Sequence, residues 1–120
     1  MAKQIENNYN TVNLIAKTTK IIGDITSESD IRIDGNLQGN LKTTGLLIVG
    51  ASGQISGEIE CKTAEIEGVI DGKITVSELL SLKATSNLKG EVVVGQLFIE
   101  PGAIFSGNCK MERSASNKIK

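Results

Sequence analysis

The side chains best suited to chemistry in this chain are carboxylates and two thiols, because the chain contains no histidine. Glu58 and Glu60 stand two residues apart, as do Glu65 and Glu67, and this spacing puts each pair on one face of an extended strand. Paired carboxylates can bind a divalent cation, but these alternate along what we interpret as a solvated face and do not cluster. Because the chain has no histidine, it lacks the most common general base and the most common zinc ligand. We therefore expect no metal site and no catalytic residues.

Cys61 and Cys109 are the only cysteines, which does not suggest a disulfide framework. In the repeat described below they lie three turns apart, roughly 14 Å at a strand spacing of about 4.8 Å. A disulfide needs Cα atoms within about 7 Å. We interpret both as buried free thiols that pack as small apolar groups.

Motifs for nucleotide or covalent chemistry do not occur. The chain has no Gly-x-x-x-x-Gly-Lys-Ser/Thr loop, no Gly-x-Ser-x-Gly and no Cys-x-x-Cys. Net charge is −1, which gives no strong field for nucleic acid. We expect no cofactor, no nucleotide and no nucleic acid, and a chain that is not an enzyme. Neither a secretory signal pattern nor an apolar run long enough to span a bilayer is visible, so we expect a cytoplasmic protein.

These side chains belong to a repeated pattern that is marked by six glycines at similar intervals along the chain. The glycines are Gly23, Gly39, Gly57, Gly72, Gly90 and Gly107. Around each glycine, apolar and polar residues alternate at period two, the pattern of a strand with one dry and one wet face. Because each glycine shares the parity of the inward residues, we interpret it as a tight bend where opposing walls come close.

Stacking these repeats predicts continuous ladders of inward side chains. The expected ladders are Ile33, Val49, Ile66, Leu82, Ile99; Leu37, Ile55, Ile70, Leu88, Phe105; and Ile25, Leu41, Ile59, Ile74, Val92, Cys109. The interior is thin, which fits a chain that is 39% hydrophobic with only three aromatic residues. The loop after the first ladder varies between short and long, and the long versions have turn compositions.

The repeat predicts an all-β fold, a right-handed parallel β-helix of about six turns. A left-handed β-helix of the acyltransferase type would keep a constant period and use a histidine, whereas the intervals between these glycines vary. We expect a flexible tail over 1–17, the β-helix over 18–111 and a second flexible tail over 112–120.

Neither end of this coil has a sequence that predicts a capping helix. Uncapped ends expose unpaired backbone groups and the end of the core, which invites stacking of copies. The residues that we expect at this polymerisation interface are Ile21, Ile22, Ile25, Leu97, Ile99, Phe105 and Met111. Phe105 is the one aromatic residue in an interior ladder, whereas Phe98 has the outward parity.

The chain resembles the bactofilins, a family of bacterial polymer-forming cytoskeletal proteins. The resemblance covers about 18–111 and is carried by TKIIGDI at 19–25, DIRIDG at 30–35, GNL at 39–41 and IEPGAIFSGNCKM at 99–111. It implies a right-handed β-helix between disordered tails. It also implies nucleotide-independent, end-to-end polymerisation into filaments without overall polarity. Such filaments scaffold cell shape and local wall synthesis and recruit partners such as cell-wall enzymes.

Many members of the family also carry a short membrane-targeting peptide at the N-terminus. Val12, Leu14 and Ile15 form a small apolar cluster beside Lys17 and are the candidates for such a contact at the inner face of the membrane. The surrounding segment is rich in asparagine, and a plain tail is the alternative.

Two other functions are compatible with a β-helix. One is a monomeric binding module that docks partners on its charged faces. The other is an enzyme on an outer groove, as in pectin-degrading β-helices, which needs carboxylates or basic residues clustered on adjacent turns. The outward charges here are mixed in sign and dispersed, so the structural polymer is the leading hypothesis.

Overall fold

The computed structural model describes residues 12–112, which wind into a coil of eleven strands with no helix among them. The strands are β1 (Val12–Ile15), β2 (Lys20–Ile22), β3 (Ile25–Ser27), β4 (Asp30–Ile33), β5 (Asn36–Gln38), β6 (Leu41–Thr43), β7 (Leu46–Val49), β8 (Gln54–Ile66), β9 (Val69–Leu82), β10 (Asn87–Ile99) and β11 (Ile104–Met111). Every strand pairing between turns is parallel.

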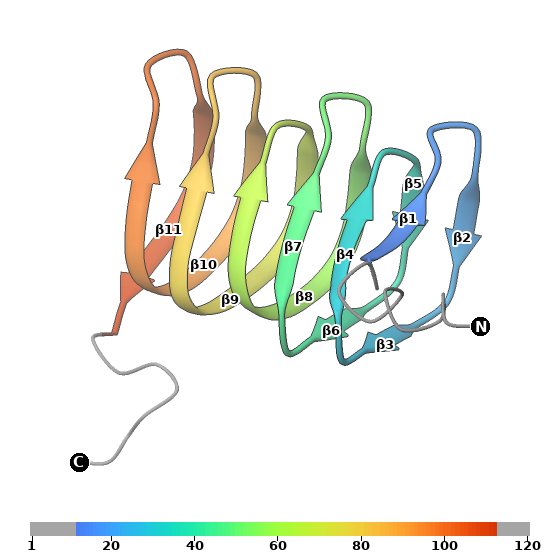
Figure 1. The fold of residues 1–120 in the computed structure, drawn as a ribbon. Helices are drawn as coiled ribbons and strands as arrows, with labels where there is room; N and C mark the ends of the chain where they lie inside the picture. The colour runs from blue at the N-terminus through green and yellow to red at the C-terminus, as the bar shows by residue number, and fades with distance from the viewer. Residues whose placement is uncertain (1–11, 113–120) are drawn as a thin grey trace, which may run out of the picture.

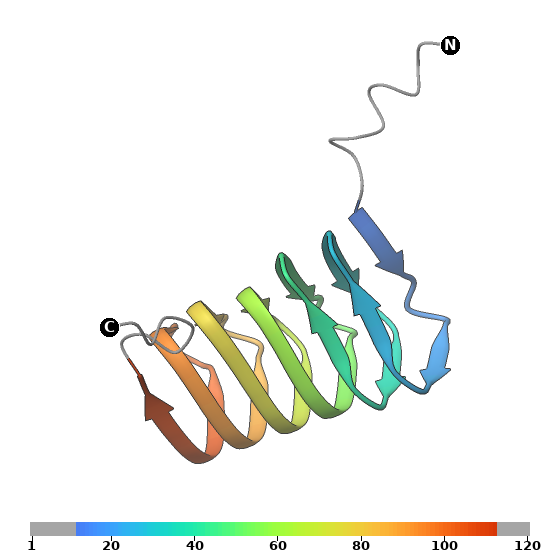
Figure 2. The ribbon, with the colours of Figure 1, turned by 90° about the horizontal axis from the view of Figure 1, so that it is seen from below.

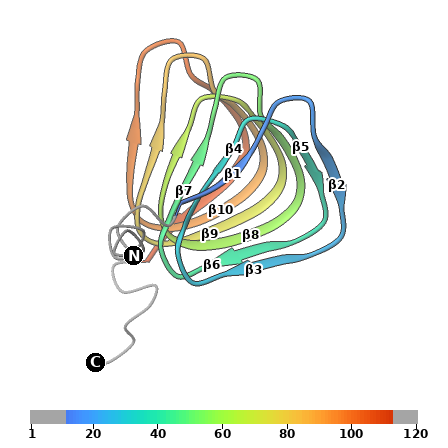
Figure 3. The ribbon, with the colours of Figure 1, turned by 45° about the vertical axis from the view of Figure 1, so that its right-hand side comes forward.

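The coil has three faces, each a ladder of parallel strand segments (Figure 3). Face 1 contains β1, β4, β7 and residues 63–66, 79–82 and 96–99. Face 2 contains β2, β5 and residues 54–56, 69–71, 87–89 and 104–106. Face 3 contains β3, β6 and residues 59–61, 74–76, 92–94 and 109–111. β8, β9 and β10 each bend around two corners and so contribute to all three faces.

The handedness follows from the path of the chain in Figure 1. The segments nearest the viewer run upward, the chain passes backward over the top, and successive turns advance from the blue end to the red end. This combination of rotation and advance makes the coil right-handed. Six turns stack along its axis, also visible in Figure 2. The expected fold class, a right-handed parallel β-helix, is confirmed.

The core consists of the predicted ladders. The register pairs Ile33 with Val49, Leu37 with Ile55 and Leu41 with Ile59, and each ladder continues through the later turns. Their members in the second to fifth turns are buried, with at most 2% of each side chain exposed. The branched aliphatic side chains therefore fill a narrow interior in which each one packs on its equivalents above and below.

The six repeat glycines form the corner between face 2 and face 3. All have φ between +129° and +148°, a conformation that L side chains rarely adopt. A Cβ added to Gly72 would overlap the carbonyl oxygen of Gly57 in the preceding turn. The glycines are thus required by the bend and by close stacking along the coil axis. Our expectation that opposing walls meet there was wrong, because the crowding atom belongs to the preceding turn.

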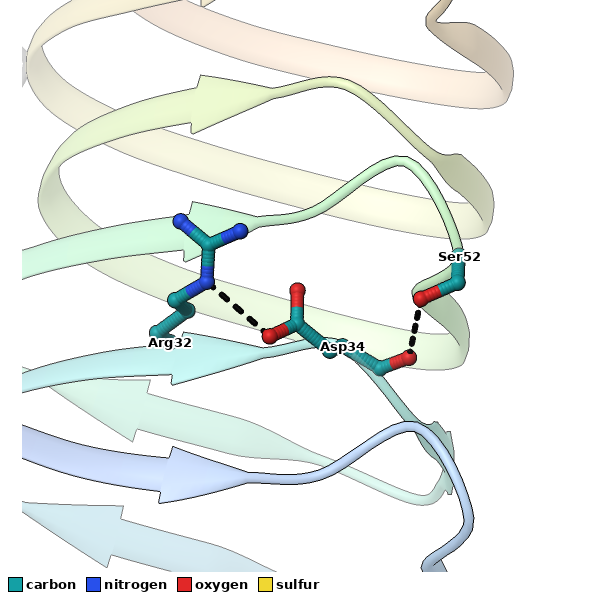
Figure 4. Close-up of polar contacts among 3 residues, drawn as sticks. All are labelled: Arg32, Asp34 and Ser52. Carbon is teal, nitrogen blue, oxygen red and sulfur yellow. Dashed lines mark hydrogen bonds and ion pairs between the residues drawn. The ribbon is translucent and has the colours of Figure 1, made fainter.

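The corner between face 1 and face 2 carries the loops of varying length, which project together at the top of Figure 1. Two of these loops are bonded to the turn before them: the Ser52 hydroxyl donates to the Asp34 carbonyl oxygen at 2.8 Å, and the Thr85 hydroxyl to that of Glu67 at 2.8 Å. Arg32 Nε donates to the Asp34 carboxylate at 3.0 Å beside the first loop (Figure 4). The loop contacts hold neighbouring turns in register.

The coil begins earlier than the sequence suggested. We expected the repeat to start at residue 18, but β1 pairs in parallel with β4, and Ile15 extends the first core ladder beyond Ile33. The expected start of the β-helix was too late because Asn13, a polar residue, stands at an inward position. It therefore breaks the alternation of apolar and polar residues in the first strand. The flexibility expected for 1–11 and 113–120 lies outside the described residues and stays a prediction.

Candidate assembly site at the two ends of the coil

Both ends of the described coil present strand edges without a pairing partner. In the first turn, β1, β2 and β3 each pair only with the strand of the second turn. In the last turn, β11 and residues 96–99 pair only with the turn before them. Each edge carries a row of free backbone donors and acceptors, and such edges readily accept a strand from another chain.

The C-terminal end of the coil is apolar. Leu97, Ala103 and Phe105 are half-buried against the core, and Ile99 is 44% exposed, whereas its equivalent one turn earlier, Leu82, is 0% exposed. Met111 and Cys109 are also exposed there. Our expectation that Cys109 is buried was therefore wrong: it occupies the predicted ladder, but no further turn covers it.

The N-terminal end of the coil is mixed in character. Ile15, Ile21 and Ile25 are half-buried against the core, as the stacking of turns requires. At the corner between face 3 and face 1, the Asn13 amide donates to the hydroxyls of Ser27 at 3.1 Å and Ser29 at 3.3 Å. This end therefore combines an apolar centre with one polar corner.

A third group of apolar residues lies on the outer surface of the two terminal turns. Ile22 is 74% exposed, Leu14 62%, Ile104 53% and Phe98 51%. Together with Ile99 and Met111, they are all the large exposed hydrophobic residues within 13–112, where side-chain burial is described, and each belongs to the first or last turn. Association through the two ends would therefore bury the most exposed apolar surface.

The residues predicted for the interface divide between these groups. Ile21, Ile25, Leu97 and Phe105 lie at the open ends of the core, and Ile99 and Met111 are exposed beside them, whereas Ile22 points outward on face 2. Ile15 and Ala103 also lie at the open ends of the core, and Ile104 is exposed in the last turn, although none of the three was in the predicted set. Ile15 could have been found from its place one repeat before Ile33, and Ile104 from its outward parity beside Phe105.

The side faces carry charges of both signs on neighbouring turns. Glu58 is adjacent to Lys73, and Glu60 lies between Lys42 and Thr75, so that carboxylates stand beside amines on neighbouring turns. Within residues 12–112, no group of three or more acidic, cysteine or histidine side chains could hold a metal ion. Such cross-strand pairs of opposite charge favour the observed register.

The two thiols differ in environment. Burial raises the pKa of the Cys61 thiol to about 12, with a smaller contribution from the charge of Glu60. Burial also raises the pKa of Cys109. Both groups are protonated at neutral pH, which is the opposite of an activated nucleophile.

The three residues considered for membrane contact lie on β1, within the sheet. Ile15 faces the core and Leu14 is exposed on face 1. Of these two, only Leu14 is available to a bilayer, and the membrane contact stays a prediction. The part of the chain that the structure describes offers no helix that could cross a membrane.

Comparison with known proteins identifies relatives of this architecture. The family model for bactofilin, described as polymer-forming cytoskeletal, matches residues 13–110. Bactofilin BacO of Myxococcus xanthus (strain DK1622) is 32% identical over 103 residues, which cover 86% of this chain and 80% of BacO. BacP of the same organism is 28% identical over 111 residues, which cover 92% of this chain but only 46% of BacP.

A solved structure has the same fold. The solid-state NMR structure of the cytoskeletal bactofilin BacA superposes with a TM-score of 0.75 at 29% sequence identity, and the match covers 84% of this chain and 96% of that one. Parallel strands, an apolar interior and unpaired strand edges at both ends of the described coil define a parallel β-solenoid. The chain belongs to the bactofilin family. This family is structural, and membership in it gives the chain a cytoskeletal role.

Proposed function

We propose that this protein assembles end to end into filaments without nucleotide and without overall polarity. The observation that carries the proposal is the location of the large exposed hydrophobic side chains of the described coil, which lie in its first and last turns. Stacking two ends would satisfy the unpaired strand edges and bury these side chains together.

Nucleotide independence is supported by how the ends are built. The groups available for contact there are backbone edges and preformed apolar side chains, which need no hydrolysis step to become complementary. Filaments of this kind in the cytoplasm would act as scaffolds for cell shape and wall synthesis and would recruit cell-wall enzymes or other proteins to one place. The charged faces remain exposed along such a filament and are the surface that partners would meet.

Electron microscopy of the purified protein tests the proposal directly. We expect filaments in buffer without nucleotide over a range of salt concentrations, because the contact is mainly apolar. Monomers that persist under all these conditions would contradict the proposed function and favour a monomeric binding module.

Phe105→Arg tests whether the C-terminal end makes the contact. In the monomer the arginine head can reach water while its stem lies on the core. In a junction the charge would be buried without a partner, a cost of about 3–5 kcal/mol, enough to shorten or abolish filaments. Gln38→Arg, which adds the same charge at an exposed position of the second turn, should leave filaments normal.

Circular dichroism separates assembly from folding in this comparison. Both variants should keep the β-sheet spectrum of the parent protein. If Phe105→Arg still forms normal filaments, Phe105 is not part of the contact between subunits. The proposed end-to-end assembly would not be contradicted by that result.

A further inference from the structure

The outer surface of the terminal turns is apolar on two faces only. Leu14 and Phe98 lie on face 1, and Ile22 and Ile104 lie on face 2. On face 3 and at its corner with face 2, the outward residues of the same two turns are polar: Asp24, Thr26, Asn108 and Lys110. Most outward positions of the inner turns on face 1 and face 2 are polar or half-buried. We call these outward apolar residues the apolar collar: Leu14 and Ile22 at one end of the coil, and Phe98 and Ile104 at the other. At both ends the collar is interrupted at face 3.

Two copies that stack through like ends are related by a two-fold axis perpendicular to the coil. Such an axis passes through one face and through the corner opposite it. The face that the axis crosses then continues into the same face of the partner copy. Each of the other two faces continues into the partner's other face. With three faces there are three possible orientations at each junction, and their chemistry differs.

An axis through face 1 would place Ile104 of face 2 against Lys110 of face 3 in the partner copy. An axis through face 2 would place Phe98 against the same polar face. Only an axis through face 3 places face 1 against the partner's face 2, which brings apolar residues onto apolar residues at both ends.

The spacing along the chain supports this orientation independently. The axis through face 3 leaves the coil at the corner between face 1 and face 2. In the last turn, Phe98 and Ile104 stand three positions before and after Pro101, and Leu97 and Phe105 stand four before and after it. The antiparallel apposition of the two copies therefore joins Phe98 with Ile104 outside and Leu97 with Phe105 inside.

The first turn shows the same symmetry about Thr18. Ile15 and Ile21 stand three positions before and after it, and Leu14 and Ile22 stand four before and after it. Each outward residue again meets an outward residue, and each core residue meets a core residue. The same orientation also sets the polar corner at Asn13 opposite the corner next to Gly23, where the Asp24 carboxylate can accept hydrogen bonds.

We propose that the two-fold axis at both junctions passes through face 3 and the corner between face 1 and face 2. Face 1 of each subunit then continues into face 2 of its neighbour, and the residues that select this orientation are Leu14, Ile22, Phe98 and Ile104. This inference rests on the proposed end-to-end assembly and goes beyond it by specifying how subunits are rotated about the filament axis.

Disulfide trapping distinguishes the three orientations at the C-terminal junction. The background is Cys109→Ser, which removes the exposed thiol while Cys61 stays buried. Opposite or diagonal positions on neighbouring strands lie about 5–8 Å apart, and the closest of these are within reach of a disulfide. Phe98→Cys, Ile104→Cys and the double variant are oxidised with copper phenanthroline and run on denaturing gels without reductant.

We expect covalent dimers from the double variant and none from either single variant. Dimers from Phe98→Cys alone would indicate an axis through face 1, dimers from Ile104→Cys alone an axis through face 2, and each result would overturn the proposal. Dimers from Phe98→Cys mixed and refolded with Leu14→Cys would indicate head-to-tail stacking and would also overturn it.

Electron microscopy of each sample separates this proposal from the proposed function. If the background protein forms filaments but the double variant gives no covalent dimer, the orientation is wrong while the assembly stands. If the background protein forms no filaments, the proposed function itself fails.

Discussion

For a single residue, position in the stack decides what its side chain does. Cys61 and Cys109 both occupy inward positions of face 3, yet one is buried and the other exposed. Cys61 in the third turn is covered on both sides by Thr43 and Val76, whereas Cys109 in the last turn is covered on one side only. The same chemical group is therefore part of the core in one turn and part of the surface in another.

Burial of Cys61 predicts a loss of stability at alkaline pH. The thiol has an ordinary pKa of 9.0 and a folded-state pKa of about 12. Because the folded pKa is raised, nothing is lost below pH 9. Between pH 9 and 12 the unfolded chain releases a proton that the folded chain keeps, and the free energy of unfolding falls by up to about 1.4 kcal/mol per pH unit.

Urea denaturation at several pH values measures this effect. Other groups titrate in the same range, so the parent protein is compared with Cys61→Val, and both carry Phe105→Arg to limit assembly. We expect a steeper fall above pH 9 in the chain that retains Cys61. Identical pH profiles would show that the thiol ionises as easily in the folded state as in the unfolded chain.

At the scale of the structural elements, the corner between face 2 and face 3 requires glycine for two separate reasons. The bend requires positive φ, and stacking leaves no room for a Cβ beside the glycine of the preceding turn. The first turn separates these causes, because an added Cβ at Gly23, with φ +136°, would meet nothing within 4 Å.

Gly72→Ala should consequently destabilise the fold much more than Gly23→Ala. At Gly72 the alanine is strained and also clashes with the Gly57 carbonyl oxygen, and we expect a loss of about 3 kcal/mol or more. At Gly23 only the backbone strain applies, about 1 kcal/mol. Urea denaturation of the two variants compares them, and equal losses would mean that stacking does not constrain this corner.

The molecule as a whole is a one-dimensional stack in which each turn contacts only its neighbours. Interior turns bury their apolar residues on both sides, and the two terminal turns cannot. The free energy available for association is therefore concentrated at the ends, and the proposed filament would continue the packing already present within the subunit.

Continuous stacking predicts the axial repeat of the filament. At about 4.8 Å per turn, six turns occupy about 29 Å, and two subunits related by a two-fold axis occupy about 58 Å. The power spectrum of aligned filaments should show a layer line at about 4.8 Å and an axial repeat of about 58 Å. A repeat of about 29 Å, the length of one subunit, would instead indicate that all subunits point the same way.

Particular residues show how far sequence patterns alone lead. The alternation around each glycine was enough to derive the three ladders, the number of turns and the loop edge, because period-two patterning is a local property of extended chain. It could not recognise the first strand, where Asn13 takes an inward position and forms hydrogen bonds that only the fold brings within reach. Alternation does place Ile21 inward and Ile22 outward, but it does not show how much of either side chain the first turn leaves exposed.

A right-handed parallel solenoid of about six turns could thus be derived from the sequence alone. The three-dimensional structure was needed to learn which side chains the two ends expose, that Cys109 lies uncovered, and that the apolar collar occupies two faces of three. The reason is physical: alternation records which side of a strand a residue faces, whereas exposure depends on whether another turn is stacked on it. That is a property of the whole coil and of where it stops.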